Sequence, residues 1–343
     1  MNWNLRILFF SEAEKVTIKY GCENIGFDSD EAMSYYKFSD YLQKTYGQKV
    51  YKIPVNLPAT CPNRDGLLSI DGCTFCGEEG AGFENLSSLL SVPEQLERNI
   101  AYISEKYHAR KFIAYFQNYS NTYFPPDIFR SYLEQACITN VVALYISTRP
   151  DCLNNRYYEV MAEVREKHSV DIVVEIGLQT VNYRTLKELN RGHGLAEFID
   201  AVIRAKKFGL STCAHMITDL PSDDPEDVKE GAKILSALAV DQVKCHSLYI
   251  LKKTKLGEMY QQGLVRPVSM EEFIERTITF LEYLSPDIVI QRLIGRAPEE
   301  RSLFCSWETS WWKVVELIED KMMREHRYQG RLCHYLNGAV CAK

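Results

Sequence analysis

The sequence has 343 residues, of which 46% are hydrophobic and 25% are charged, and its formal net charge is −6. This composition is typical of a folded globular protein and excludes a global basic field, so nucleic acid would have to bind a local patch. Eleven cysteines would suggest disulfides in a small secreted domain, but no signal-peptide pattern and no run of ~20 apolar residues is present, so we expect a cytoplasmic protein.

The first part of the chain has no clear pattern. Residues 1–34 mix aromatic and acidic side chains, and we expect them to form an N-terminal extension. Residues 35–47 predict a short helix that ends at Gly47, because glycine readily takes the left-handed conformation that closes a helix.

From Lys49 onward, apolar β-branched runs alternate with amphipathic stretches. The runs predict strands at 50–56, 111–117, 141–147, 171–178, 210–217 and 241–250. The amphipathic stretches predict helices at 92–107, 126–137, 153–167, 195–208 and 224–238. Such alternation predicts a parallel sheet, and the polar motifs follow the strands, as at the active edge of a (β/α) barrel. Periodicity alone leaves open whether the sheet closes.

The pattern changes after residue 255. A capped helix is predicted from Ser269 to Leu284, followed by a strand at 287–295. The aromatic stretch SWETSWWK (306–313) then leads into a helix that reaches about His326. We expect residues 256–343 to form a small C-terminal accessory region on an α/β core of residues 35–255.

Three cysteines between the first strand and the first long helix carry the clearest chemistry. Cys61, Cys73 and Cys76 have the spacing C-x11-C-x2-C, and Gly66 and Gly72 allow turns that bring the sulfurs together. Thiolates suit zinc or an iron–sulfur cluster. A structural zinc site usually has four protein ligands, whereas a four-iron cluster held by three cysteines keeps one iron open for an outside ligand. The spacing of the cysteines alone is compatible with either zinc or an iron–sulfur cluster.

The stretch YKIPVNLPATCPNRDGLLSIDGCTFC (51–76) resembles the cluster loop of radical S-adenosylmethionine (SAM) enzymes of the YhcC/YtqA branch, relatives of the elongator catalytic subunit. Further matching segments are AYFQNYSNTY (114–123), STRPDCL (147–153), VEIGLQT (174–180), LNRGH (189–193) and YQGR (328–331). The resemblance implies a laterally open, six-unit partial barrel of the radical SAM type. It also implies a [4Fe–4S] cluster on the three cysteines, SAM, and an electron donor such as flavodoxin or ferredoxin.

The resemblance also implies residues that contact SAM. Gln117 and Thr122 lie where the family contacts the methionine end, and their groups suit an amine and a carboxylate. Gln179 and Arg191 match the family pattern GLQ…NRG, and the planar fork of an arginine suits the SAM carboxylate.

Two further candidates have structural alternatives. Glu175 lies in an apolar strand, where a carboxylate is costly unless it is paired, so it is either a cofactor contact or a core ion pair. His215 lies where relatives place a polar group near the ribose, but a lone histidine on a strand is often a core residue. The chain departs from the family at Asp219, where glycine is usual, and in QRLIGRAP (291–298), where HRLTGDGP is common.

The substrate is the least determined part of the function. Resemblance to the elongator catalytic subunit favours modification of a wobble uridine side chain in tRNA. Arginines in the C-terminal region, together with Trp307, Trp311 and Trp312, could bind phosphates and stack on bases, although such charges usually form a solvated face. The alternatives are a small metabolite or peptide substrate, and a zinc-stabilised binding module without catalysis.

Overall fold

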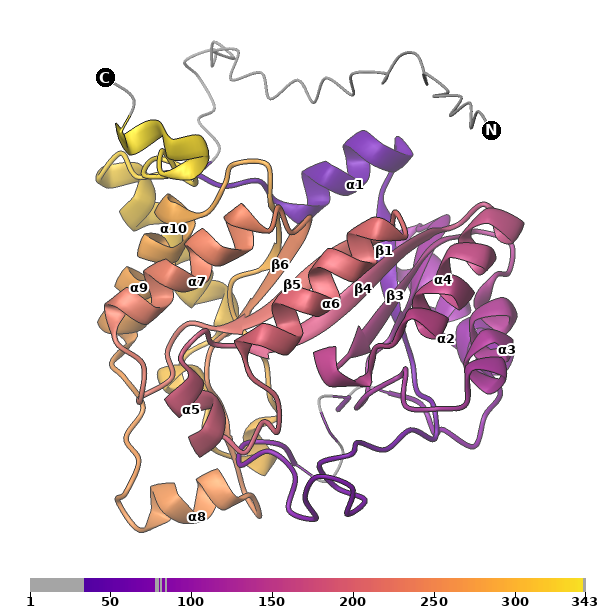
Figure 1. Ribbon diagram of the computed structural model, residues 1–343, viewed down its shortest axis with the longest axis horizontal. Coiled ribbons are helices and arrows are strands. Elements are labelled where there is room, and N and C mark those ends of the chain that lie inside the picture. Colours follow the sequence, from indigo (N-terminus) through magenta and orange to yellow (C-terminus); the bar gives the residue numbers. More distant parts are fainter. Residues whose placement is uncertain (1–33, 78–79, 81, 84, 342–343) are drawn as a thin grey trace, which may run out of the picture. The chain divides into compact units, whose positions relative to one another are not determined.

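Seven parallel strands form one curled sheet with the order β1-β2-β3-β4-β5-β6-β8 (Figure 1). The computed structural model describes residues 34–77, 80, 82–83 and 85–341, so the predicted N-terminal extension lies outside the described residues. The strands of this sheet are β1 (Val50–Val55), β2 (Lys111–Phe116), β3 (Val141–Thr148), β4 (Asp171–Gln179), β5 (Ser211–Ile217), β6 (Gln242–His246) and β8 (Val289–Arg292).

Helices lie between the successive strands of the sheet, as the alternating pattern predicts, and one further helix stands before the first strand and one after the last. The helices are α1 (Phe38–Tyr46), α2 (Val92–Tyr107), α3 (Pro126–Ala136), α4 (Asn155–His168), α5 (Tyr183–Glu188), α6 (Leu195–Lys207), α7 (Pro225–Ala237), α8 (Lys255–Gln261), α9 (Met270–Tyr283) and α10 (Trp311–Arg324). Capping residues in the sequence determine where several of these helices begin. Ser91 and Glu94 form a reciprocal capping box at α2, and Asp224 caps α7 just before its first-turn proline, Pro225. None of the helices in the described part of the chain is long and apolar enough to cross a membrane.

The two faces of the sheet have different partners. On the outer face, strand residues such as Phe116, Ile146 and Val174 pack against α2, α3, α4, α6, α7, α9 and α10 in the main hydrophobic core (Figure 1). Near the amino ends of the strands, the inner face carries a smaller apolar cluster closed by Leu42 and neighbouring aromatic residues of α1. Tyr46 Oη also donates to Asp171 Oδ2 at the start of β4 (2.7 Å). Helix α1 therefore closes the amino end of the sheet, and polar side chains occupy the inner face above it.

The partial barrel is confirmed, with two differences from the predicted strands and two short helices, α5 and α8, that were not predicted. The predicted strand 241–250 is wrong in its second half, because β6 ends at His246 and residues 250–251 form β7, which pairs with β9 (Ser302–Phe304) in a separate antiparallel sheet. The backbone leaves the main sheet here since the N–H of Leu248 is bound by the Asp219 carboxylate (2.7 Å). The strand from the C-terminal region, β8, instead pairs with β6 and becomes the seventh strand.

Candidate functional site

The three predicted cysteine ligands lie in the loop between β1 and α2, beyond the carboxyl end of β1. Gly66 and Gly72 have φ angles of 95° and 75°, which confirms the left-handed turns expected from the sequence. Arg64 Nη2 donates to the carbonyl oxygens of Cys76 (2.7 Å) and Gly77 (2.6 Å) and so joins the two ends of the loop.

The loop is held against the segment that follows α5. Asn63 Nδ2 donates to the Asn190 carbonyl, and Asn190 Nδ2 donates back to the Gly72 carbonyl (2.7 Å). The N–H of Thr74 donates to Leu189 O (3.0 Å). Because backbone and amide groups are paired on both sides, the cysteines have a defined position relative to Arg191.

Nitrogen donors surround the cysteine sulfurs. Arg191 Nη1 lies 3.1 Å from Cys73 Sγ, and Asn63 Nδ2 lies 3.5 Å from the same sulfur. Arg149 Nη1 lies 3.9 Å from Cys61 Sγ. Burial raises the pKa of the Cys76 thiol, whereas the nearby Arg64 lowers it. Cationic donors favour thiolate, which is the form that binds a metal or a cluster.

The spacing of the sulfurs distinguishes between the two readings of the loop. In the described residues, the one group of three candidate ligand atoms within 4.8 Å of one another is Glu175, Cys213 and His215. At least one of the distances between the sulfurs of Cys61, Cys73 and Cys76 therefore exceeds 4.8 Å. Sulfur ligands 2.3 Å from a tetrahedral zinc would lie only ~3.8 Å apart. The donor set fits a larger iron–sulfur cluster better than a single zinc ion.

Arg191 and Gln179 lie together above the end of β4. A Cβ atom on Gly177 would approach both Arg191 Nη2 and Gln179 Nε2 to 3.1 Å, so the glycine leaves room for these two side chains. Arg191 Nη2 donates to Gly177 O (3.0 Å) and to His193 Nε2 (2.9 Å), while its Nε–H is buried without a partner in the described part of the chain. Burial lowers the pKa of His193 to about 2, so this ring is neutral and can accept. The unpaired Nε–H is a donor that a bound cofactor could satisfy.

Glu175 is the centre of a buried polar network on the inner face. Its carboxylate, 0% exposed, accepts from Lys52 Nζ (2.5 Å), Lys244 Nζ (3.1 Å) and His215 Nε2 (2.8 Å). Burial alone would raise the pKa of Glu175, but Lys244, Lys52 and His215 hold it well below its usual range. The core ion pair considered from the sequence is therefore present, with two lysines rather than one.

His215 belongs to the same network. Burial lowers its pKa to about 4, so the imidazole is neutral near pH 7 and donates one hydrogen bond to Glu175. Gln291 Nε2 also reaches Glu175 Oε1 (3.1 Å) and Cys213 Sγ (3.2 Å). Position 291, where this chain departs from the common family motif, is thus a member of the network.

The two residues predicted after β2 have different surroundings. The hydroxyl of Thr122 is buried, donates to Cys152 O (2.8 Å) and shares a hydrogen bond with Thr148 Oγ1 (2.6 Å). In this arrangement Thr122 holds the loop after β2 against the one after β3. Gln117, the first residue after β2, lines a cavity instead.

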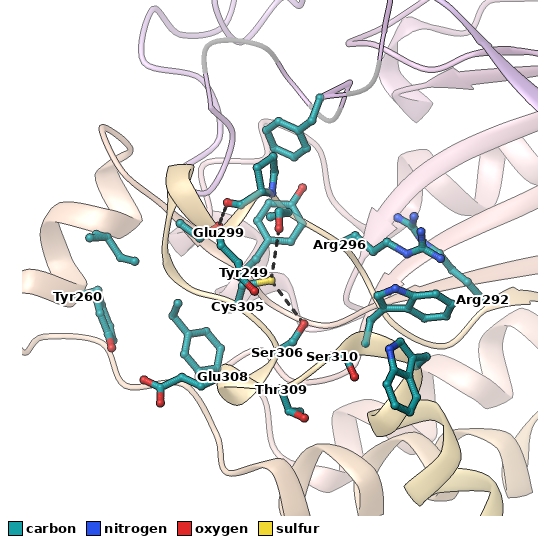
Figure 2. Close-up of a pocket in the computed structure, with 18 of the residues that line it drawn as sticks. Tyr249, Tyr260, Arg292, Arg296, Glu299, Cys305, Ser306, Glu308, Thr309 and Ser310 are labelled. Carbon is teal, nitrogen blue, oxygen red and sulfur yellow. Dashed lines mark hydrogen bonds between the residues drawn. The ribbon is translucent and has the colours of Figure 1, made fainter. Parts of the chain in front are cut away.

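This cavity has a volume of about 840 Å³ and lies between the carboxyl end of the sheet and the C-terminal segment 296–312 (Figure 2). Its wall includes Tyr249, and burial raises the pKa of that phenol to about 12, with a further contribution from the Cys76 thiol. The Tyr249 ring also contacts Phe83, which lies in the same β1–α2 loop as the cysteines, with 6.2 Å between the ring centres. Trp311 and Trp312 are 39% and 58% exposed, and the guanidinium carbon of Arg296 lies 3.7 Å from the centre of the Trp311 ring.

Sequence reasoning missed four residues of the site. Arg149 was noticed only as part of STRPDCL, yet it pairs with Asp151 (2.7 Å), donates to Arg191 O (2.6 Å) and approaches Cys61. Asn63 was noticed only as part of CPNRDG. Lys52 interrupts a largely apolar strand, as Glu175 does, and Lys244 lies between Val243 and Cys245 in β6. A search for charged residues on strands would have found the two lysines, though not their common partner.

Comparison with known proteins agrees with this geometry. The family model described as the Radical SAM superfamily matches residues 55–235, and the Radical_SAM C-terminal domain model matches residues 240–324. The chain is similar to the protein YtqA of Bacillus subtilis, with 31% identity over 307 residues that cover 88% of this chain and 94% of YtqA.

Two more distant similarities involve proteins named for tRNA or for Elongator. The tRNA uridine(34) acetyltransferase of Methanocaldococcus jannaschii is 30% identical over 158 residues, which are 45% of this chain and 28% of that protein. The solved structure of Methanocaldococcus infernus Elp3 lacking residues 1–46 superposes with a TM-score of 0.65 at 18% identity, covering 82% of this chain and 64% of that one. The second likeness concerns the fold.

Proposed function

This chain belongs to the radical SAM superfamily, in the branch of YhcC and YtqA, and from that premise we propose that it modifies the wobble uridine of tRNA. Enzymes of this family use a [4Fe–4S] cluster and SAM. When bound, these cofactors supply a 5′-deoxyadenosyl radical, by one-electron cleavage of SAM, that takes a hydrogen atom from the substrate.

In this proposal the protein positions the cofactors and keeps water away. Cys61, Cys73 and Cys76 would hold the cluster, and their wide spacing together with the donors from Arg149 and Arg191 supports this assignment. The amine and carboxylate of SAM's methionine end would meet Gln179, Arg191 and Gln117, Thr122 would hold the loop that carries Gln117, and Glu175 and His215 would face the remainder of the molecule. The buried, unpaired Nε–H of Arg191 supports its part in this set.

The observation that carries the tRNA substrate is the aromatic and cationic wall of the cavity beside the cysteine loop. Exposed Trp311 and Trp312 can stack on bases, and Arg296 adds positive charge next to them. The volume of about 840 Å³ falls within the range of roughly 300–1,000 Å³ common for small-ligand sites, so a splayed-out nucleotide would fit. Similarity to a protein named tRNA uridine(34) acetyltransferase supports the position in the anticodon.

Mass spectrometry of tRNA nucleosides tests the proposal. We expect at least one modified uridine to be lost from cells that lack the gene, to return with the wild-type gene, and to stay absent when only the Cys73→Ala variant is expressed. An identical nucleoside profile in all strains, with the wild-type protein present and carrying its cluster, would contradict the tRNA substrate and favour a small metabolite or peptide.

A further inference from the structure

The cavity beside the sheet has an uneven distribution of charge. Two arginines, Arg292 and Arg296, and two glutamates, Glu299 and Glu308, line it, and Figure 2 shows the arginines on one side and Glu308 on the other. Arg292 is the last residue of β8, so its backbone is fixed in the main sheet. Arg296 stacks on Trp311, which places the indole wall at the cationic side. A ligand in this cavity would therefore meet positive charge and aromatic surface together.

Arg292 lacks an acidic partner in the described part of the chain. Its Nη2 donates to His246 Nδ1 (2.7 Å), a ring nitrogen that carries no negative charge. Burial lowers the pKa of His246 well below its usual value, and Arg292 lowers it further, so this imidazole is neutral. The Nε–H of Arg292 is buried and has no hydrogen-bond acceptor among the residues that the structure describes. A buried guanidinium with an unpaired N–H and a neutral neighbour destabilises the folded protein unless a ligand supplies an acceptor and a negative charge.

The charged groups next to Arg292 on the inner face of the sheet do not neutralise its positive charge. Lys52 and Lys244 lie on the same inner face of the sheet, and both already share the Glu175 carboxylate. Three basic side chains therefore accompany one buried acid. Burial lowers the pKa of Lys244 to about 7. The positive charges of Lys52 and Arg292 also lower this pKa, whereas the negative charge of Glu175 raises it. This excess of positive charge favours an anionic group from outside the protein.

We propose that the cavity binds a planar substrate that carries an anionic oxygen group, and that Arg292 binds this group while the ring lies against Trp311 and Trp312. A phosphate of a nucleotide and a carboxylate on the base have the same chemistry here, since both accept parallel hydrogen bonds from a guanidinium. The inference rests on the proposed function in placing the substrate in this cavity. It adds that substrate selection depends on charge as well as on stacking.

Paired probes separate the two sources of the anion. The protein, loaded with its cluster and with SAM, would be titrated with each probe in a calorimeter. The pairs to compare are uridine 5′-monophosphate with uridine, and orotate with uracil. We expect the anionic member of at least one pair to bind about 10-fold or more tightly, as a charged hydrogen bond predicts. Preference within the first pair assigns the anion to a phosphate, and preference within the second assigns it to a carboxylate.

Substitutions of Arg292 link the preference to this side chain. Arg292→Gln should abolish the difference within the pair, and Arg292→Lys should retain part of it, with iron content and circular dichroism unchanged. Arg184→Gln, at an exposed arginine of α5, is the matched control and should behave as wild type. Equal binding of anionic and neutral probes, no binding of any probe, or a preference that survives in Arg292→Gln would overturn the inference. An unchanged tRNA profile would instead refute the proposed function and leave a preference for anions in place.

Discussion

The cysteine loop and the cavity lie side by side at the carboxyl end of the sheet, but the arginines in the two regions have different partners. Around the loop, Arg149 pairs with Asp151, and Arg191 donates to Cys73 and Gly177. At the cavity, the hydrogen-bond partner of Arg292 among the described residues is a neutral histidine, His246. In the first region the protein itself supplies most of the partners of the arginines. In the second region a ligand would neutralise the positive charge of Arg292. Cofactor binding and substrate selection should therefore be separable by mutation.

The largest effect is expected in the cysteine loop. Cys73→Ala removes the sulfur that Arg191 and Asn63 contact, so SAM cleavage under dithionite should fall to background and iron content should drop. Cys137→Ala is the control, because that half-buried thiol donates to Leu133 O in α3 (3.3 Å), away from the loop. Iron and sulfide analysis after anaerobic reconstitution measures both. A Cys73→Ala protein with full iron content and full turnover would disprove the assignment.

Between the two regions lies the Glu175 network, where the main effect should be on stability. Glu175→Gln leaves Lys52 and Lys244 without a counter-charge in a buried site, which should lower the free energy of unfolding by about 3–5 kcal/mol. Glu163→Gln is the matched control, since Glu163 is 54% exposed and its pair with Arg130 should contribute less than about 1 kcal/mol. Urea denaturation measures both. Equal losses would mean that the network does not depend on the charge of Glu175.

A smaller effect is expected for cofactor affinity. Arg191→Ala removes the guanidinium whose Nε–H is unpaired, and SAM binding should weaken by roughly 1.5–3 kcal/mol if one charged hydrogen bond is lost. Arg184→Ala changes an exposed arginine of α5 and should leave the dissociation constant unchanged. Equilibrium dialysis with labelled SAM gives both values. The same dissociation constant for Arg191→Ala and wild type would remove Arg191 from the SAM site.

The smallest effect should appear at the cavity. Trp312→Ala removes one exposed indole from the wall, and tRNA binding should weaken by about 1–3 kcal/mol if a base stacks there, while SAM cleavage without tRNA stays the same. Tyr102→Ala on α2 is the control, because Tyr102 is equally exposed, at 59%, and does not line the cavity. Filter binding at several salt concentrations measures the change. A parallel loss of SAM cleavage would show that the two regions are not separable.

Short-range patterns in the sequence predicted the elements and the cysteine loop. Strand runs and capping signals placed α2 at Val92–Tyr107, as predicted, and glycine at positions 66 and 72 predicted the two left-handed turns. These features depend on residues within a few positions of one another. The strand predicted to 250 failed because its end depends on a distant group, the Asp219 carboxylate that binds Leu248 N–H.

The sequence by itself determined the fold class, the three cysteines of the loop and the presence of a carboxylate, Glu175, on an apolar strand. Only the tertiary structure decided that Lys52 of β1, Glu175 of β4 and Lys244 of β6 meet, and that Arg292 lines the cavity without a carboxylate partner among the described residues. The alternation of side chains along a strand is local and has a period of two residues. Which side chains meet across the inner face depends on strand order and curl, which arise from contacts between residues more than a hundred positions apart.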